Sequence, residues 1–395
     1  MSIMKYALPV LAIAGSALAQ QCASPTTTIQ NAGDASQLSG CPTYSGDIVI
    51  ATGTSDNLDF GDLGSIDGSF TAVNVTQITQ ITANSLTSIT QSFDLEQLTI
   101  LATLNFPKLG SVGQLKWITL PALQGLNFGD PGLELATDVQ ISDTQLGSLD
   151  GINLMSVNTI SIQENRYLND IGIQLRHINT SLTLLGNGNN LNVSLPNLEN
   201  AFNLTFINVS SIDFPALQST NGSLIIQGSE MPTVSAPNIT YINQSLTLNN
   251  NEKLTNVSMP QLIQIGGGFT FAHNPEYMNM NGFPNLKTIK GAVDVNGNFT
   301  NVTLPSLSDV EGAFNLQSTK DIDDDCSTFK NQAGQNSAIK GKFTCAGSQT
   351  NPGGAGTSPS AGSSSSATGA ATALDISSGA VYGLTGVLAA MIGLF

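Results

Sequence analysis

The chain has 395 residues, of which 40% are hydrophobic and only 10% are charged, against about 25% charged in an ordinary soluble protein. Lys and Arg number 12 and Asp and Glu number 28, a net charge of −16. The cations form no cluster that could displace counterions from phosphates, which excludes a nucleic-acid-binding protein. Two His and four Cys without a paired Cys motif leave little material for a zinc site, so no cofactor is expected. Polarity carried by hydroxyl and amide groups is typical of a surface outside the cell.

Residues 1–19 have the three parts of a secretory signal peptide. Lys5 supplies the positive region, residues 6–15 the apolar region and Ala17-Leu18-Ala19 the cleavage site. The apolar stretch is too short to span a bilayer. The alternative, a buried first helix, is disfavoured, and the mature chain is predicted to begin at Gln20.

The middle of the chain repeats one unit. Short runs that alternate apolar and other residues recur at a nearly constant interval, from DVQI at Asp138 to AFNL at Ala313. A coil of about 22 residues with one short strand cannot bury its own apolar side, so stacking is required. We therefore predict an all-β solenoid over residues 20–346, with a long parallel sheet. The inward residues are expected to be Leu182, Leu184, Leu204, Phe206, Leu224, Ile226, Leu246, Leu248, Phe269 and Phe271.

A second marker, apolar-Pro-x-apolar, follows most of the strands, as in LPNL at Pro196 and MPQL at Pro260. Because Pro donates no backbone hydrogen bond, this segment is predicted to form a second side of the coil or a corner. Asn-rich turns such as GNGNN (186–190) separate the two segments, since Asn and Gly tolerate positive φ and cap free backbone groups. Between residues 107 and 152 the period breaks, which indicates either an insertion or a seam between two lobes.

Four cysteines bracket the repeats, Cys22 and Cys41 before them and Cys326 and Cys345 after them. The two pairs have the same spacing along the chain. A solenoid has two open ends that require caps. In a secreted chain, bridges Cys22–Cys41 and Cys326–Cys345 would staple these caps, and locality favours that pairing among the three connectivities that four Cys allow.

The chain contains eleven N-x-S/T sequons, the acceptor motif for N-linked glycans. Asn179, Asn221 and Asn243 each lie two residues before a strand, and a second trio each lies four residues before its Pro. Stacked coils would place each trio on one strip, which predicts two glycan-coated strips. The sequons are Asn74, Asn179, Asn192, Asn203, Asn208, Asn221, Asn238, Asn243, Asn256, Asn298 and Asn301.

The outer face of the sheet is then the face left free for a partner. Its candidate residues are the middle residues of successive strands, Thr183, Thr205, Thr247 and Thr270. In this row Ile225, Asp294 and Asn315 are also expected to point outward. The row contains no aromatic platform of the kind that grips sugar rings, so a lectin is not favoured. A simple β-propensity ladder is the competing interpretation.

Candidate catalytic groups are few. Asp94 and Glu96 would share a strand face, but glycoside cleavage needs two carboxylates across a cleft and a continuous sheet offers none. His177 and His273 lie about four coils apart, which rules out a joint ligand or acid–base pair. The acidic run 321–325 lacks the Gly and terminal Glu of an EF-hand loop and is expected to be an exposed cap. Trp117 is predicted to be core or partly buried, and no enzyme is expected.

The C-terminal end carries a second targeting signal. Residues 347–369 are small and polar and predict a flexible stalk. A polar spacer and a terminal apolar tail follow, the pattern of a glycosylphosphatidylinositol (GPI) attachment signal. The attachment residue is predicted at Gly369, within 365–371, with residues 370–395 removed. A tail-anchoring helix, the alternative, would need about 20 apolar residues.

Taken together, the signal peptide, coils of the SLTLNNNEKLTNVSMPQL type, terminal Cys pairs, stalk and GPI signal resemble a fungal family. It is the family of GPI-anchored cell-wall organisation and sporulation-specific proteins, and its repeats resemble receptor L-domains. The resemblance implies a right-handed, leucine-rich-repeat-like solenoid and a role in wall integrity, at the outer leaflet of the plasma membrane or in the cell wall. Wall glucan or wall proteins are its implied partners, and it brings no catalytic residues. The alternatives are a receptor-like or adhesive binding module and a wall-remodelling glycosidase or transglycosylase.

Overall fold

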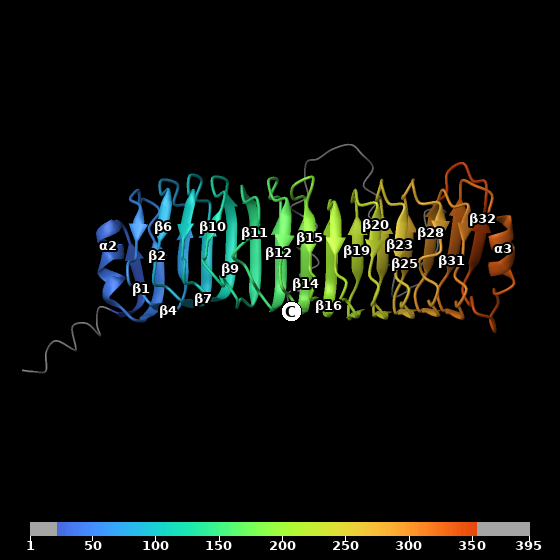
Figure 1. The fold of residues 1–395 in the computed structure, drawn as a ribbon, viewed down its shortest axis with the longest axis horizontal. Coiled ribbons are helices and arrows are strands. Elements are labelled where there is room, and N and C mark those ends of the chain that lie inside the picture. The colour runs from blue at the N-terminus through green and yellow to red at the C-terminus, as the bar shows by residue number, and fades with distance from the viewer. Residues whose placement is uncertain (1–21, 354–395) are drawn as a thin grey trace, which may run out of the picture. The chain divides into compact units, whose positions relative to one another are not determined.

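The computed structural model of the protein describes residues 22–353. The predicted signal peptide, Gly369 and the apolar tail lie outside the described residues. The fold is all-β, as predicted from the repeat, and consists of about 13 coils of roughly 22 residues. Figure 1 shows the coils stacked side by side from the N-terminal helix to the C-terminal one.

Every coil contributes to one main sheet of 21 strands, in which all pairings are parallel. Some coils contribute one long strand, such as β14, and others two short ones, such as β18 and β19. The strands are β1 (Ala23–Ile29), β2 (Tyr44–Ile50), β4 (Ser65–Asp67), β5 (Phe70–Val73), β7 (Ser88–Glu96), β9 (Ser111–Leu120), β11 (Asp138–Thr144), β12 (Ser156–Gln163), β14 (His177–Leu185), β16 (Asn200–Ile207), β18 (Ser219–Thr220), β19 (Leu224–Gln227), β21 (Tyr241–Ile242), β22 (Leu246–Asn249), β24 (Gln264–Ile265), β25 (Phe269–Ala272), β27 (Thr288–Ile289), β28 (Val293–Gly297), β30 (Asp309–Val310), β31 (Phe314–Ser318) and β32 (Phe343–Ala346).

The other side of the coils carries short parallel strands in four separate sheets. These strands precede the Pro-containing segments, which form the turns that lead back to the main sheet, so the Pro marker is a corner. The sheets are β3 (Leu58–Asp59), β6 (Gln80–Thr82), β8 (Thr103–Asn105) and β10 (Leu126–Asn127); β13 (Asp170–Gly172), β15 (Asn192–Ser194) and β17 (Ser211–Asp213); β20 (Thr233–Ser235) and β23 (Asn256–Ser258); and β26 (Asn279–Met280) and β29 (Asn301–Val302).

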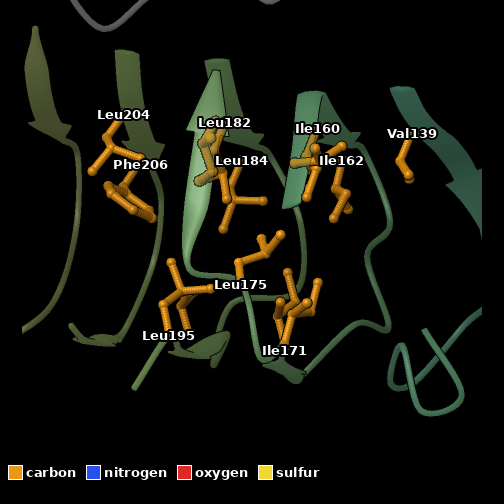
Figure 2. Close-up of a cluster of buried hydrophobic side chains, with 14 of the residues drawn as sticks. Val139, Ile160, Ile162, Ile171, Leu175, Leu182, Leu184, Leu195, Leu204 and Phe206 are labelled. Atoms are coloured by element: carbon orange, nitrogen blue, oxygen red, sulfur yellow. The ribbon is translucent and has the colours of Figure 1, made fainter. Parts of the chain in front are cut away.

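The core lies between the two sides of the coils. All ten predicted inward residues are buried, none more than 1% exposed. Figure 2 shows Leu182 and Leu184 of β14 facing Leu175 and Leu195 from the opposite side. Because each coil also packs on its neighbours, burial is continuous along the stack. Trp117 is fully buried as predicted, with its ring 5.7 Å from that of Phe93.

One residue per coil turns the chain out of the main sheet with a positive φ. These residues lie at the end of the main strand or directly after it in ten successive coils, and their φ values lie between 53° and 63°. L-residues other than Gly, Asn and Asp rarely adopt this conformation, yet Gln, Thr, Glu and His hold it here. They are Asn74, Gln97, Thr119, Asp143, Glu164, Gly186, Asn208, Gly228, Asn250 and His273.

The next residue in each of these coils points inward and is buried, and in four coils it is an asparagine. Asn251 accepts a hydrogen bond from the backbone N–H of Ser229 (3.1 Å) and donates to the carbonyl of Ile226 (3.2 Å). Its own N–H donates to the side chain of Asn274 in the following coil (2.9 Å). The buried asparagines thus satisfy the backbone groups that the turn removes from the sheet. The four are Asn165, Asn187, Asn251 and Asn274.

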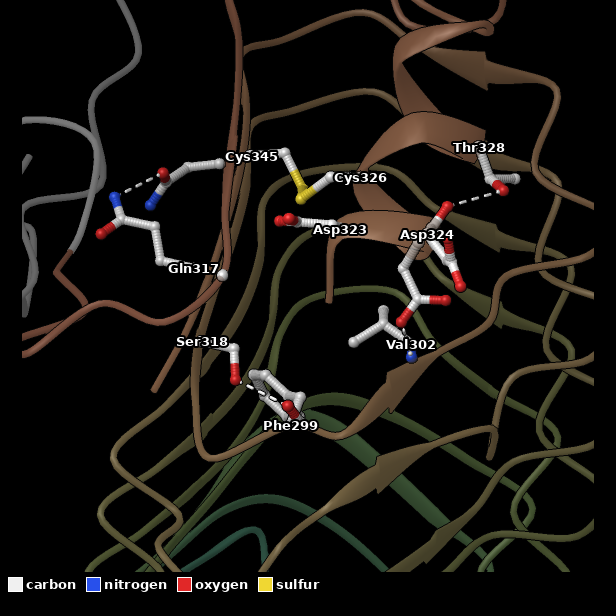
Figure 3. Close-up of a disulfide and its surroundings, with 12 residues drawn as sticks. Phe299, Val302, Gln317, Ser318, Asp323, Asp324, Cys326, Thr328 and Cys345 are labelled. Atoms are coloured by element: carbon white, nitrogen blue, oxygen red, sulfur yellow. Dashed lines mark hydrogen bonds between the residues drawn. A yellow bond between two sulfur atoms is a disulfide. The ribbon is translucent and has the colours of Figure 1, made fainter. Parts of the chain in front are cut away.

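Helical caps close both ends of the stack. The N-terminal cap is α2 (Ala32–Gln37), whose first turn is capped by the side chain of Asn31, followed by η1 (Leu38–Gly40). The C-terminal cap is α3 (Asp323–Lys330). Disulfides Cys22–Cys41 and Cys326–Cys345 join each cap to the adjacent strand region, the pairing expected from locality. Figure 3 shows the C-terminal bridge beside α3.

The irregular stretch between residues 107 and 152 leaves the main sheet intact. β9, β11 and β12 pair in sequence through it, with Lys116, Gln140 and Ser161 in register. On the other side no named strand lies between β10 and β13, and isolated bridges such as Leu133 to Ile152 take its place. On the main-sheet side the irregularity is limited to one edge, where an isolated bridge joins Leu135 to Ser111 at the start of β9.

Candidate interaction surface

The outward residues at the middle of the main strands form one continuous row, which we call the central row. Register connects each member to the next across the whole sheet. The four candidate threonines stand in this row and are half-buried. The row runs Thr28, Val49, Thr71, Asp94, Lys116, Gln140, Ser161, Thr183, Thr205, Ile225, Thr247, Thr270, Asp294, Asn315 and Thr344.

The prediction that Asn315 is exposed on the outer face is wrong. Asn315 is 0% exposed, although it stands on the outer side of β31. The segment after β32 returns across this strand, and the carbonyl of Gly353 accepts a hydrogen bond from Asn315 Nδ2 (3.0 Å). The outer face of the main sheet is thus covered at its C-terminal end.

Next to the central row lies a small apolar cluster that the sequence reasoning missed. Leu185 and Ile207 are register partners on β14 and β16, and Ile225 pairs with Thr205 beside them. All three are half-buried. The available signal was the extra apolar residue that ends SLTLL and NLTFI. The surface around Thr183 and Thr205 is therefore uncharged and partly apolar rather than a uniform row of hydroxyls.

The two carboxylates considered for catalysis do share the outer face, but they are tied to one cation. Lys116 Nζ lies 3.5 Å from Asp94 Oδ2 and forms a second ion pair with Glu96. Partial burial raises the pKa of the Asp94 carboxyl, with Lys116 opposing the shift and Glu96 adding to it. The hydrogen bond to Glu96 raises the pKa of Lys116. The arrangement is an ion-pair cluster on a sheet face, not two carboxylates facing each other across a cleft.

A hollow of about 460 Å³ lies at the N-terminal cap, three strands of the main sheet before the strand of Asp94. Its lining residues are Thr27, Thr28, Gln30, Asn31, Asp34, Gln37 and Leu38. Asp34 is the one carboxylate among them and accepts a hydrogen bond from the N–H of Gln30 (2.8 Å). This lining offers no pair of carboxylates for acid–base chemistry.

The remaining titratable candidates are dispersed. His177 stands exposed on β14 and His273 at a turn four coils later. Three acidic residues form the first turn of α3, where a negative charge interacts favourably with the helix dipole. One of them, Asp325, accepts a hydrogen bond from the N–H of Val302 (2.9 Å). Within residues 22–353, no group of three or more His, Cys, Asp or Glu is placed to hold a metal ion.

The sequon asparagines are exposed at eight positions and half-buried at Asn203, Asn298 and Asn301. The trio that precedes Pro segments occupies one register position, because Asn192, Asn256 and Asn301 are the first residues of β15, β23 and β29. In the other trio, Asn243 Nδ2 donates to Asn221 Oδ1 of the previous coil (3.1 Å).

Three sequons fall outside these two trios in an informative way. Asn74 and Asn208 are positive-φ turn residues and share a third position of the coil. Asn203 lies on β16, where Leu204 and Phe206 are buried, and it therefore points outward with Thr205. Its Oδ1 accepts a hydrogen bond from the N–H of Ser223 (2.9 Å). A glycan on Asn203 would stand on the outer face of the sheet.

Within the described residues, no helix is both long enough and apolar enough to pass through a bilayer.

Comparison with known proteins identifies a matching family model and several similar proteins. A family model described as Ecm33, a GPI-anchored cell wall organization protein, matches residues 1–39. The chain is 39% identical over 367 residues to Protein ecm33 of Aspergillus fumigatus, covering 91% of each chain. It is 36% identical over 353 residues to the cell surface GPI-anchored protein of Arthroderma benhamiae, covering 89% of each.

A more distant relative is Sporulation-specific protein 22 of Saccharomyces cerevisiae, 27% identical over 84% of this chain and 72% of the relative. No solved structure matches the chain. Since the relatives at 39% and 36% identity align with nearly the whole of both chains, the protein belongs to the Ecm33 family of fungal GPI-anchored cell wall organization proteins.

Proposed function

We propose that the mature protein is a GPI-anchored, N-glycosylated solenoid that supports fungal cell-wall organisation without enzymatic activity. The observation that carries this proposal is the 39% identity to Protein ecm33 over 91% of the chain. Two features of the structure support it: a disulfide staples the cap at each end of the stack, and the two carboxylates considered for catalysis are both paired with Lys116. The protein would reside at the outer leaflet of the plasma membrane, in the cell wall, or in both.

The experiment that tests the role is deletion of the gene followed by growth on wall-perturbing dyes, with the full chain reintroduced as control. Hypersensitivity that the reintroduced chain corrects is expected. Wild-type resistance of the deletion strain would refute the role in wall organisation. Incubating the purified protein with β-glucan, chitin and mannan tests the absence of enzymatic activity, and release of products would overturn it.

The anchor and its processing form a separate part of the proposal. We expect residues 1–19 and 370–395 to be removed and lipid to be attached at Gly369, at the end of the predicted stalk of residues 347–369. The first residues of that stalk are not free, because Ser348, Gln349 and Gly353 hydrogen-bond to the solenoid. Phosphatidylinositol-specific phospholipase should release the protein from cells. A surface-resident protein whose C-terminal peptide ends at Phe395 would contradict this processing.

For the partner, we propose wall glucan or a wall protein docked across Thr183, Thr205, Thr247 and Thr270. The support is the uncharged, half-buried character of the central row between Ser161 and Thr270. Thr247→Arg adds a large charged side chain to this surface. The variant should restore less resistance to wall-perturbing dyes than the wild-type chain does, without a lower melting temperature. Gln261→Arg is the matched control, because Gln261 is exposed in the Pro corner. Identical phenotypes of both variants and the wild type would refute this docking surface.

A further inference from the structure

The chain does not leave the solenoid at its C-terminal tip. After β32 it turns at Ser348, whose φ is 53°. The N–H groups of Ser348 and Gln349 then donate to the carbonyls of Lys320 (2.8 Å) and Ser318 (2.9 Å). Gly353 reaches the outer side of β31, one strand back from the end of the main sheet.

Two amide side chains of β31 hold the backbone of Gly353 there. The Gly353 N–H donates to Gln317 Oε1 (3.1 Å), and the Gly353 carbonyl accepts from Asn315 Nδ2 (3.0 Å). Gln317 Nε2 donates to Asn315 Oδ1 (2.9 Å) and closes a ring of three hydrogen bonds. The second N–H of Asn315 donates to Asp294 Oδ1 (2.8 Å), which fixes the orientation of the amide.

This is a built site rather than a loose contact. Asn315 is 0% exposed, and its Oδ1 and Nδ2 atoms are both hydrogen-bonded. The two side-chain amides together satisfy both backbone polar groups of Gly353. Since the contacts are to backbone atoms, the glycine side of the interaction needs a free N–H and carbonyl rather than a particular side chain.

We propose that Asn315, Gln317 and Asp294 form an amide clamp that binds the backbone of Gly353 and makes the outer face of the main sheet the exit point of the C-terminal segment. One consequence rests on the proposed anchor. If the chain beyond Gly353 leads to a lipid anchor, a force applied through the anchor acts first on the clamp. The ladder between β31 and β32 is loaded afterwards, and the Cys326–Cys345 bridge prevents β32 from being drawn away.

The clamp is tested by protection of the segment against proteolysis in the secreted and the cell-bound protein. Residues 347–369 contain no Lys or Arg, so a protease of broad specificity such as subtilisin is used instead of trypsin. Gln317→Leu removes the acceptor for the glycine N–H, and Gly353→Pro removes the N–H itself. Each variant should raise the rate of cleavage within 347–353 about five- to thirtyfold, the effect of losing one or two hydrogen bonds of about 1 kcal/mol net each.

Two matched variants separate the clamp from general effects. Gly353→Ala keeps the N–H and the carbonyl, and a Cβ there meets no atom within 4 Å, so it should remain protected. Gln227→Leu removes a half-buried glutamine from β19, four coils earlier, and should also leave cleavage unchanged. Wild-type protection in Gln317→Leu and Gly353→Pro, or equal loss in Gly353→Ala, would overturn the clamp. Failure of the anchor proposal would show instead as phospholipase-resistant attachment, with the cleavage rates of the secreted chain unaffected.

Discussion

Three consecutive asparagines, Asn249, Asn250 and Asn251, offer a test of how position in the coil decides the role of a residue. Asn249 ends β22 and is half-buried, with its side chain beside His273 (3.1 Å). Asn250 is exposed and has a φ of 55°. Asn251 is 0% exposed. Replacing each with Ala in turn removes the same atoms from three different environments.

The expected costs follow from the contacts. Asn251→Ala removes the hydrogen bonds to the Ser229 N–H and the Ile226 carbonyl and leaves both backbone groups buried without this partner. At about 1–3 kcal/mol for each unsatisfied group, the loss should be about 3 kcal/mol. Asn250→Ala meets the left-handed backbone cost of about 1–2 kcal/mol. Asn249→Ala removes one half-buried hydrogen bond, to His273, and should cost about 1 kcal/mol or less.

Thermal unfolding of the three variants, together with hydrogen exchange of peptides from β19 to β25, measures this order. Local exchange is needed because a stack of coils can lose stability near one coil without unfolding as a unit. Asn250→Gly is the matched control, since glycine adopts a positive φ without strain and should melt at or above the wild-type temperature. Equal destabilisation by Asn249→Ala and Asn251→Ala would refute the assignment of roles by burial.

Three further outcomes are expected. Leu248→Ala should destabilise the protein by about 2–5 kcal/mol because it leaves a cavity between stacked coils. Thr247 is its outward neighbour, and Thr247→Ala should cost less than about 0.5 kcal/mol. Equal melting temperatures of the two variants would contradict the inward and outward assignment. Burial raises the pKa of Tyr277 from 10.0 to about 12, so the unfolded chain loses this proton at a lower pH than the folded chain and the free energy of unfolding falls between pH about 10 and about 12. In melts across that range, Tyr277→Phe should lose less stability than the wild type, and an equal loss would contradict this reasoning. Glu96→Gln removes an ion pair of Lys116 and should cost no more than about 1 kcal/mol because that lysine is 38% exposed, and denaturant melts that show a larger loss would mean that the cluster is structural.

The sequence predicts the main sheet and its inward residues because both depend on short-range patterns. Alternation with period two tells Leu182 and Leu184 from Thr183 wherever a strand is extended, and the regular repeat then stacks like residues on like. The disulfides were predictable for a similar reason, since each joins two cysteines that are close in sequence at one cap.

What the sequence reasoning missed depends on contacts that no local pattern contains. Asn315 occupies an outward position by alternation, and it is buried only because Gly353, far along the chain, returns over it. Asn187 was predicted as a turn residue, but its burial arises from the neighbouring coil, in which it satisfies the carbonyl of Ile162. Leu185 follows the alternating run and becomes a surface feature only through its register with Ile207.

Two predictions for the outer face exclude each other at the coil of β16: a glycan on Asn203 and a partner docked across Thr205. The sequon at Asn203 uses the hydroxyl of Thr205 as its third residue, and both side chains point outward from β16. A glycan on Asn203 would cover the apolar cluster and the first half of the proposed docking surface, since Thr183 is the register partner of Thr205. At the other end, the amide clamp already covers β31. An occupied Asn203 would therefore restrict any partner to the central row from Ile225 to Asp294, and an empty one would leave it open from Ser161 onward.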